Sequence, residues 1–218
     1  MSFFDSMVAF LQNGGTFIYP IALVLVLGLA ITIERWLYLS SVNRANQKAF
    51  SLIQNALKTA DISAIDKHAQ SSDAPVLNVL KSGIARLSNA SRREDVEYAM
   101  EETIMEYMLR LEKRTPFLAI LANIATLLGL LGTIMGLIAA FSAVANADPA
   151  EKANLLSASI SVAMNTTAFG LITAIPLILF HSSLQTKTAT ITDSLEMAGI
   201  KLLNALSFNQ QMDANRGE

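Results

Sequence analysis

Residues 129–136 read GLLGTIMG, a stretch with three glycines and one threonine inside a long apolar run. Inside a helix, glycine is less favourable than alanine by about 1 kcal/mol, so three glycines in one short stretch need a physical reason. Their spacing of three and four residues places Gly129, Gly132 and Gly136 on one face of a helix. Because small residues let helix backbones approach closely in a membrane, this face predicts tight packing against a second helix.

The composition around this stretch indicates a membrane protein. Of the 218 residues, 52% are hydrophobic and 16% are charged, and the mean hydropathy is +0.42. Soluble domains carry about a quarter charged residues, and a helix needs about 20 apolar residues to cross a bilayer. Three stretches come close to or exceed that length and contain no Asp, Glu, Lys, Arg or His: residues 17–33, 117–145 and 160–180.

The sequence also argues against several classes of function. The net charge of −2 does not favour nucleic acid as a main partner. The absence of cysteine excludes disulfides, thiolate metal sites and cysteine nucleophiles. No phosphate-binding loop, metal-ligand cluster or nucleophile–base pair is found in the sequence. We therefore expect neither an enzyme nor a resident cofactor or metal.

The distribution of Lys and Arg predicts how the chain is oriented. Residues 1–33 have none, residues 34–115 have twelve, and the loop between the second and third spans has only Lys152. Because cytoplasmic loops are enriched in basic residues, we expect the N-terminus in the periplasm and the C-terminus in the cytoplasm. We predict an all-α membrane protein with three transmembrane helices, two of them long and extended into a cytoplasmic helical bundle.

The expected organisation has seven segments. It comprises a periplasmic interfacial helix (1–15), a first transmembrane helix (16–38), a cytoplasmic helical region (39–115), a second transmembrane helix (116–146), a short periplasmic loop (147–157), a third transmembrane helix (158–181) and a cytoplasmic C-terminal helix and tail (182–218).

Capping and periodicity give details of the cytoplasmic helices. Asp73 is expected to cap a helix that starts near Pro75, and Ser91 with Glu94 has the pattern of a capping box. We find no clear stop after this second helix, so we expect it to continue into the second span with a kink at Pro116. Apolar residues at helical spacing predict two buried stripes, formed by Val96, Met100, Ile104, Tyr107 and Leu111, and by Leu184, Ile191, Leu195, Ala198, Leu202 and Leu206.

Polar residues line one face of each of the last two spans. Thr133 lies on the same face of the second span as Asn123 and Thr126. In the third span, Ser159, Thr166 and Thr173 recur every seven residues, and Asn165 and Thr167 flank them. Polar groups in a membrane face the bundle interior or water, so these faces predict a shared polar strip. The strip has hydroxyls and amides but no titrating group, which predicts that a second subunit supplies the charge.

These residues resemble a known family. GLLGTIMGLIAAF at 129–141, ISVAMNTTAFGLITAIP at 160–176, and GGTFIYPI and ITIERWLYL within 14–39 are similar to the MotA/TolQ/ExbB proton channel family, on its ExbB and TolQ side. The resemblance implies a homopentamer in the bacterial inner membrane that surrounds two copies of a small single-span partner similar to ExbD or TolR. That partner carries a membrane aspartate, and the proton motive force drives the motor.

The resemblance also implies which residues face the partner. Family pore threonines match Thr133 and Thr167, with Thr166 as a third and with Asn165 and Thr173 beside them. Three sites depart from the family pattern, because Thr126 replaces a proline, Val162 replaces a glutamate, and His181–Ser182 replaces a tyrosine–asparagine pair. Without that glutamate the transported ion is either H⁺ or Na⁺. The process energised is outer-membrane transport through a TonB-like protein or, alternatively, a Tol-like or gliding-type motor. A non-conducting membrane scaffold is the remaining alternative.

Overall fold

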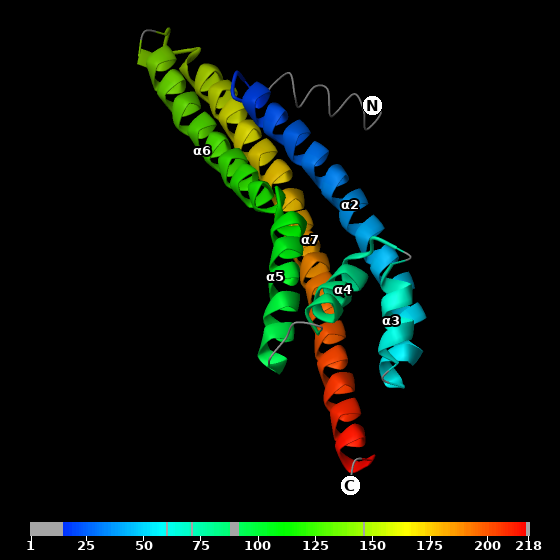
Figure 1. Ribbon diagram of the computed structural model, residues 1–218. Coiled ribbons are helices and arrows are strands. Elements are labelled where there is room, and N and C mark those ends of the chain that lie inside the picture. The colour runs from blue at the N-terminus through cyan, green and yellow to red at the C-terminus, as the bar shows by residue number, and fades with distance from the viewer. Residues whose placement is uncertain (1–14, 60, 71, 88–91, 146, 217–218) are drawn as a thin grey trace. The chain divides into compact units, whose positions relative to one another are not determined.

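The computed structural model describes residues 15–59, 61–70, 72–87, 92–145 and 147–216, with side chains up to Ser207. Its described residues are mostly helical and include no strand, which confirms the predicted all-α class. Residues 1–14, which make up nearly all of the expected periplasmic helix, lie outside the described part. The helices are α2 (Ile18–Lys58), α3 (Ile62–Ala69), α4 (Pro75–Leu87), α5 (Arg93–Glu112), α6 (Thr115–Ala145) and α7 (Lys152–Arg216) (Figure 1).

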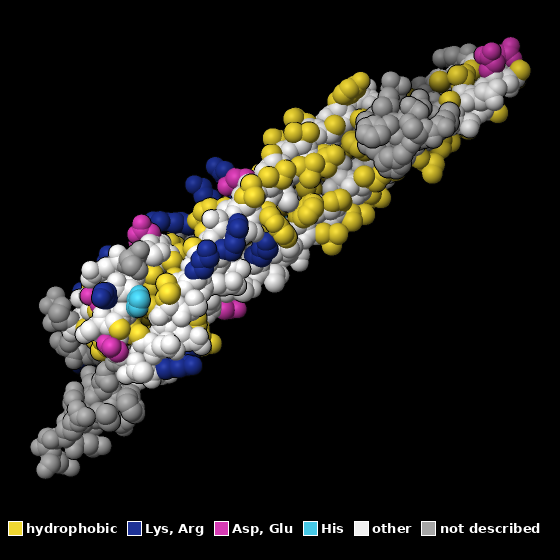
Figure 2. Space-filling view, turned by 90° about the vertical axis from the view of Figure 1, so that its right-hand side faces the viewer, with side chains coloured by type: hydrophobic (Ala, Val, Ile, Leu, Met, Phe, Trp, Pro, Cys, Tyr) yellow, Lys and Arg dark blue, Asp and Glu magenta, His cyan; other side chains and the backbone are white. Residues whose placement is uncertain are grey.

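Three helical stretches are long and apolar enough to cross a membrane, and they contain α2, α6 and α7. Their apolar side chains are largely exposed in the isolated chain, as expected where lipid or another subunit covers them. Figure 2 shows one face on which such side chains gather. The chain divides into two compact units. The first unit contains the described residues up to Glu34 together with Arg114–Ser183, and the second contains Arg35–Lys113 and the chain from Leu184 onward.

The second unit is built around one apolar core to which α2, α3, α4, α5 and α7 all contribute. Both predicted stripes are confirmed, because Val96, Met100, Ile104 and Leu111 are buried on α5, while Leu184, Ile191, Leu195, Ala198 and Leu202 are buried on α7. Tyr107 and Leu206, the remaining residues of the two stripes, are partly buried and pack against this core. Gly83 allows close packing here, since a Cβ atom at this position would lie 2.8 Å from the Met100 sulfur.

The expected continuous helix from residue 92 to residue 145 is wrong. Helix α5 ends at Glu112, Arg114 adopts a left-handed conformation with φ of 68°, and α6 begins at Thr115. Pro116 therefore lies in the first turn of α6, where its missing N–H group costs little. The proline does not kink a helix at this position, because a new helix starts there.

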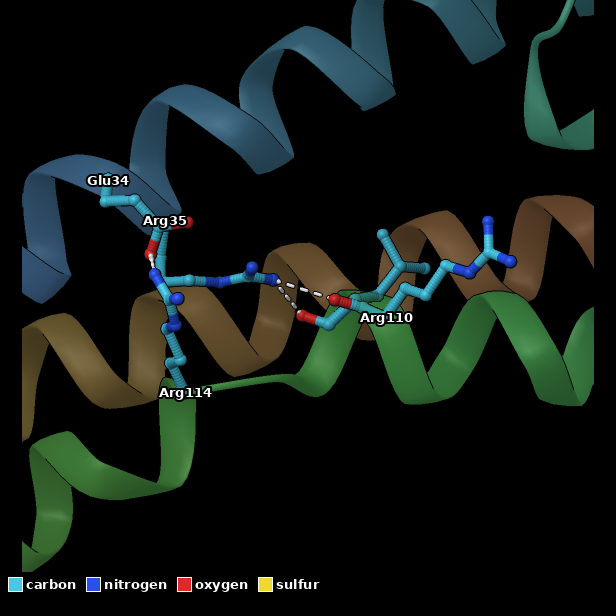
Figure 3. A network of polar contacts seen from close by, with 5 residues as sticks. Glu34, Arg35, Arg110 and Arg114 are labelled. Atoms are coloured by element: carbon cyan, nitrogen blue, oxygen red, sulfur yellow. Dashed lines mark hydrogen bonds and ion pairs between the residues drawn. The ribbon is translucent and has the colours of Figure 1, made fainter.

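Arg35 accounts for the end of α5 (Figure 3). It is only 3% exposed, and its guanidinium donates to the backbone carbonyls of Arg110 and Leu111. These carbonyls belong to the last turn of α5, where a helix lacks its own donors. The guanidinium also lies 4.7 Å from the centre of the Tyr38 ring. In the first unit, Arg114 forms an ion pair with Glu34 at 3.5 Å.

Two helix starts in the second unit use caps that differ from those expected. The N–H of Val76, in the first turn of α4, donates to Asn46 Oδ1 on α2 at 2.8 Å. A side chain from another helix thus serves where Asp73 was expected. At the start of α5, Asp95 accepts from the N–H of Arg92 at 3.1 Å. Arg92 is the N-cap and Asp95, not the expected Glu94, stands three residues after it, while Ser91 lies outside the described residues.

Candidate functional site

Helices α6 and α7 of the first unit approach each other closely at Gly129 and Gly170. A Cβ atom added to Gly170 would lie 2.7 Å from the Ala125 carbonyl oxygen and 3.1 Å from Gly129 Cα. A Cβ atom added to Gly129 would lie 3.3 Å from Thr167 Cα. Because these neighbours are backbone atoms, a side chain at Gly170 requires α6 and α7 to move apart, and one at Gly129 requires a shift of a few tenths of an ångström. We call this contact line between α6 and α7 the glycine seam.

The other two glycines of the opening stretch also lie on the glycine seam, but they face side chains. A Cβ atom at Gly132 would lie 2.9 Å from Thr166 Cβ, and one at Gly136 would lie 2.6 Å from Ala163 Cβ. Gly129, Gly132 and Gly136 therefore all face α7. Gly170 was not among the residues predicted to pack on this face. Its place four residues after Thr166, within the TTAFGL string, was the available signal.

The glycine seam brings Thr133 and Thr167 together. Their hydroxyl oxygens are 3.1 Å apart, close enough for a hydrogen bond in either direction. Thr167 Oγ1 also donates to the Gly129 carbonyl at 2.8 Å, and Thr133 Oγ1 donates to the Leu130 carbonyl at 2.7 Å. Both threonines are partly exposed at the surface of the chain. The two hydroxyls and two carbonyls form a compact group of oxygen atoms, which we call the threonine pair.

The threonine pair has fewer protons than contacts. Thr133 Oγ1 also lies 3.4 Å from the Gly129 carbonyl oxygen. Each hydroxyl has one hydrogen and two acceptor positions, so two hydrogens serve four contacts: three with the two carbonyls and one between the hydroxyls. When both hydroxyls donate to the carbonyls, their lone pairs face outward together and can accept from an external O–H group or contact a cation. When one hydroxyl rotates, it can donate to an external anion. The pair can therefore contact a carboxyl group in either protonation state.

The structure places the other predicted residues differently. Thr166 and Thr173 are buried inside the first unit. Thr166 Oγ1 donates to the Val162 carbonyl at 2.9 Å, whereas the buried hydroxyl of Thr173 has no hydrogen-bond partner among the described residues. Asn165 is partly exposed. Thr133, Asn165 and Thr167 are thus accessible from outside the chain, whereas Thr166 and Thr173 are buried in it.

The surroundings of the threonine pair carry no ionisable group of their own. The three apolar stretches 17–33, 117–145 and 160–180 contain no Asp, Glu, Lys, Arg or His, and the nearest such residues in sequence are Glu34, Arg114, Asp148 and His181 at their ends. Among the described residues, no group of His, Asp and Glu could hold a metal ion. Any charge that moves past the threonine pair must then come from an ion or from another chain.

The fold and the site together define a multi-pass helical membrane protein with a hydroxyl pair between two closely packed spans. The chain belongs to the MotA/TolQ/ExbB proton channel family, whose sequence model matches residues 71–197. This match includes both strings that form the glycine seam. It makes the chain a protein of a channel and transport family, and together with the three spans it places the chain in the inner membrane.

Individual relatives come from both branches of the family. A putative biopolymer transport protein ExbB homolog of Methanothermobacter thermautotrophicus is 27% identical over 200 residues, which cover 90% of this chain and 69% of the relative. The Tol-Pal system protein TolQ of Pseudomonas aeruginosa is 25% identical, with 81% of this chain and 82% of the relative covered. The TolQ of Haemophilus influenzae is 30% identical over 55% of this chain and 46% of the relative.

Proposed function

We propose that the chain is the channel subunit of an ion-driven motor in the inner membrane, and that the threonine pair contacts a carboxyl group supplied by a second protein. The observation that carries the proposal is the 3.1 Å contact between Thr133 Oγ1 and Thr167 Oγ1, in spans that contain no titrating group. A threonine hydroxyl neither gains nor loses a proton at neutral pH. It can donate a hydrogen bond to a carboxylate or accept one from a carboxylic acid. The pair can thus stay in contact with the carboxyl group while that group gains and loses a proton.

The proposed assembly is a ring of five copies around two copies of a single-span partner similar to ExbD or TolR, whose span carries an aspartate. Family membership and the large exposed apolar surface of the spans support an oligomer. The proposed orientation puts the N-terminus in the periplasm and the C-terminus in the cytoplasm, supported by the twelve Lys and Arg residues within 34–115.

The process that the motor energises has two candidates. One is outer-membrane transport through a TonB-like protein, supported by relatives named ExbB. The other is a Tol-like role in the cell envelope, which relatives named TolQ support equally well. The transported ion is proposed to be H⁺, with Na⁺ as the alternative because Val162 stands where the family has a glutamate.

The first experiment tests the assembly. The chain is co-expressed with its adjacent genes, and the complex is purified gently and weighed by native mass spectrometry. We expect five copies of this chain with two copies of a small protein whose single span contains Asp or Glu. An oligomer of this chain alone, with no acidic partner, would favour the scaffold, because no group would remain to carry the ion.

The second experiment tests the threonine pair. We expect that Thr133→Val or Thr167→Val lowers ion flux through the reconstituted complex at least tenfold, because valine keeps the shape and removes the hydroxyl. Thr126→Val is the matched control, since its hydroxyl donates only to the Ala122 carbonyl of its own helix at 3.1 Å. Unchanged flux in both pair variants would argue against the proposal. Flux under a H⁺ or a Na⁺ gradient identifies the ion.

A further inference from the structure

A groove of about 350 Å³ runs between α5 and α7 of the second unit. Its floor is apolar and includes Met100, Ile104 and Leu203, and its lining also contains the acidic residues Glu97, Glu101 and Glu196. Met105 and Ile200 border it and are 62% and 54% exposed. Apolar side chains that are exposed next to one another outside the spans are typical of a surface that another molecule covers.

Helix α2 presents a surface of opposite character within the same unit. Arg44, Lys48 and Leu52 are spaced four residues apart, so they form one ridge along the helix. All three are exposed, and Leu52 is 59% exposed although it is large and apolar. We call this surface the basic ridge and the groove between α5 and α7 the acidic groove. The basic ridge has the positive charge that complements the acidic groove, and Leu52 is an apolar side chain that can contact the apolar residues of that groove.

The contacts between α2 and α7 show which of these residues lie at the same height along the two helices. Asn46 Nδ2 donates to Ser194 Oγ at 2.7 Å, a separation of 148 residues in sequence. Lys187 Nζ donates to Ser40 Oγ at 3.0 Å, a separation of 147. The two helices therefore run in the same direction in this unit, and these two hydrogen bonds give an offset of 147 to 148 residues. With that offset, Lys48 is level with Glu196, and Leu52 is level with Ile200.

The same contacts show that these residues point in opposite directions. Asn46 and Ser194 face each other, and two further residues turn a helix by about 200°. Lys48 therefore projects away from α7, and Glu196 projects away from α2, in agreement with the exposure of both side chains. One chain thus carries a basic ridge and an acidic groove at the same height but on opposite sides of the α2–α7 pair.

We propose that the basic ridge of one copy of this chain occupies the acidic groove of the next copy, with Lys48 against Glu196 and Glu101 and with Leu52 against Ile200. In a ring whose rotation axis lies along the membrane normal, every copy stands at the same height in the membrane. The basic ridge of one copy is therefore level with the acidic groove of the next copy, and the two surfaces can meet without tilting either copy. Such a head-to-tail contact is heterologous, and it closes into a ring when the rotation fits. The proposal rests on the proposed ring and identifies one surface that holds it together.

The equal heights favour a second copy over an unrelated basic partner. An unrelated peptide could fit the acidic groove with its basic residues at any height, and it would leave Leu52 exposed on the basic ridge. A second copy covers the exposed apolar residues of both surfaces at once. It also pairs positive with negative side chains, which favours the correct neighbour over other partners.

Disulfide cross-linking tests the contact directly, because the natural chain contains no cysteine. Leu52→Cys and Ile200→Cys are placed in separate, differently tagged chains, which are co-expressed, and membranes are oxidised mildly. We expect a cross-linked dimer that carries both tags, and neither variant alone should cross-link. Leu52→Cys with Tyr98→Cys is the matched control, because Tyr98 is 65% exposed on α5 but does not line the groove. When Leu52→Cys and Ile200→Cys are placed in the same chain, oxidation should give a series of cross-linked oligomers on a gel. The largest of them should contain as many copies as the ring.

Charge exchange provides a second test. We expect Lys48→Glu to lower the cross-linking yield by about two- to fivefold, the effect of an exposed ion pair, and Glu196→Lys in the neighbouring chain to restore it. Gly199→Leu should fill part of the groove and lower the cross-linking yield, since a Cβ atom at Gly199 meets only the Met100 side chain, at 3.7 Å.

Some outcomes would overturn the inference. A cross-link formed by Ile200→Cys with itself would indicate a two-fold contact, and capture of a different protein by both cysteines would indicate another occupant. An oligomer seen by native mass spectrometry without the mixed cross-link would contradict this interface while leaving the proposed function intact. A monomer by mass spectrometry would contradict both.

Discussion

Asn46 on α2 caps the first turn of α4 by accepting a hydrogen bond from the backbone N–H of Val76 at 2.8 Å. Both residues are buried, and the same amide donates to Ser194 on α7. Three helices of the second unit are thus joined by one side chain. A buried N–H without a partner costs about 1–3 kcal/mol. Asn46 therefore contributes more to the stability of the second unit than the size of its side chain suggests.

We predict that Asn46→Ala lowers the melting temperature of the detergent-solubilised protein, with a loss of about 2–3 kcal/mol in the free energy of unfolding. The reason is that Val76 N–H stays buried without an acceptor. Circular dichroism during heating measures the effect. Asn55→Ala is the matched control, because Asn55 is exposed on the same helix. Equal melting temperatures for the two variants would show that another group can cap α4.

We predict that Arg35→Met loosens the last turn of α5. The carbonyls of Arg110 and Leu111 lose a charged donor, and each such bond contributes about 1.5–3 kcal/mol. Trypsin should then cut faster after Lys113 and Arg114, and the rate is measured by mass spectrometry of the fragments. Arg86→Met, at an exposed position on α4, should leave the rate unchanged. No faster cleavage in the Arg35 variant would mean that α5 ends for another reason.

We predict opposite effects for two Gly→Ala changes. Gly170→Ala brings a Cβ atom to 2.7 Å from the Ala125 carbonyl oxygen, so α6 and α7 must separate at a cost of about 1–3 kcal/mol. Ion flux should fall as well, because the threonine pair opens. Gly199→Ala meets no atom closer than 3.7 Å and should be neutral or stabilising by up to about 1 kcal/mol. Thermal melting and flux separate the two cases.

We predict that Thr173→Val stabilises the isolated chain by about 1 kcal/mol, because it replaces a buried hydroxyl that has no partner among the described residues with a methyl group of similar size. Thr166→Val should not stabilise it, since that hydroxyl donates to the Val162 carbonyl. Melting temperatures in the same detergent give the comparison. A lower melting temperature for Thr173→Val would reveal a partner for this hydroxyl, such as water or a neighbouring subunit.

The periodic features of this protein could be predicted from the sequence. The apolar stripes on α5 and α7 follow from spacing within one helix, and so does the common face of Gly129, Gly132 and Gly136. Each of these patterns is local, and a helix of fixed pitch converts it directly into a face.

The features that depend on a second helix could not be predicted in the same way. The end of α5 depends on Arg35, which is 75 residues away from Arg110, and the cap of α4 depends on Asn46. Pro116 and Asp73 were the nearest local signals, and both led to wrong expectations. The threonine faces were predicted separately, but the 3.1 Å contact between them depends on the register that the glycine seam imposes.

The glycine seam also determines how the sequence can vary between relatives. At Gly132 the obstructing neighbour is the side chain of Thr166, so alanine at position 132 can be accompanied by a smaller residue at position 166. At Gly170 the obstructing atom is a main-chain oxygen, and no substitution on α6 removes it. Positions 132 and 166 are therefore free to change as a pair, whereas position 170 must stay glycine for as long as the two spans remain in contact. An alignment of relatives should show that positions 132 and 166 covary, whereas position 170 should be glycine throughout.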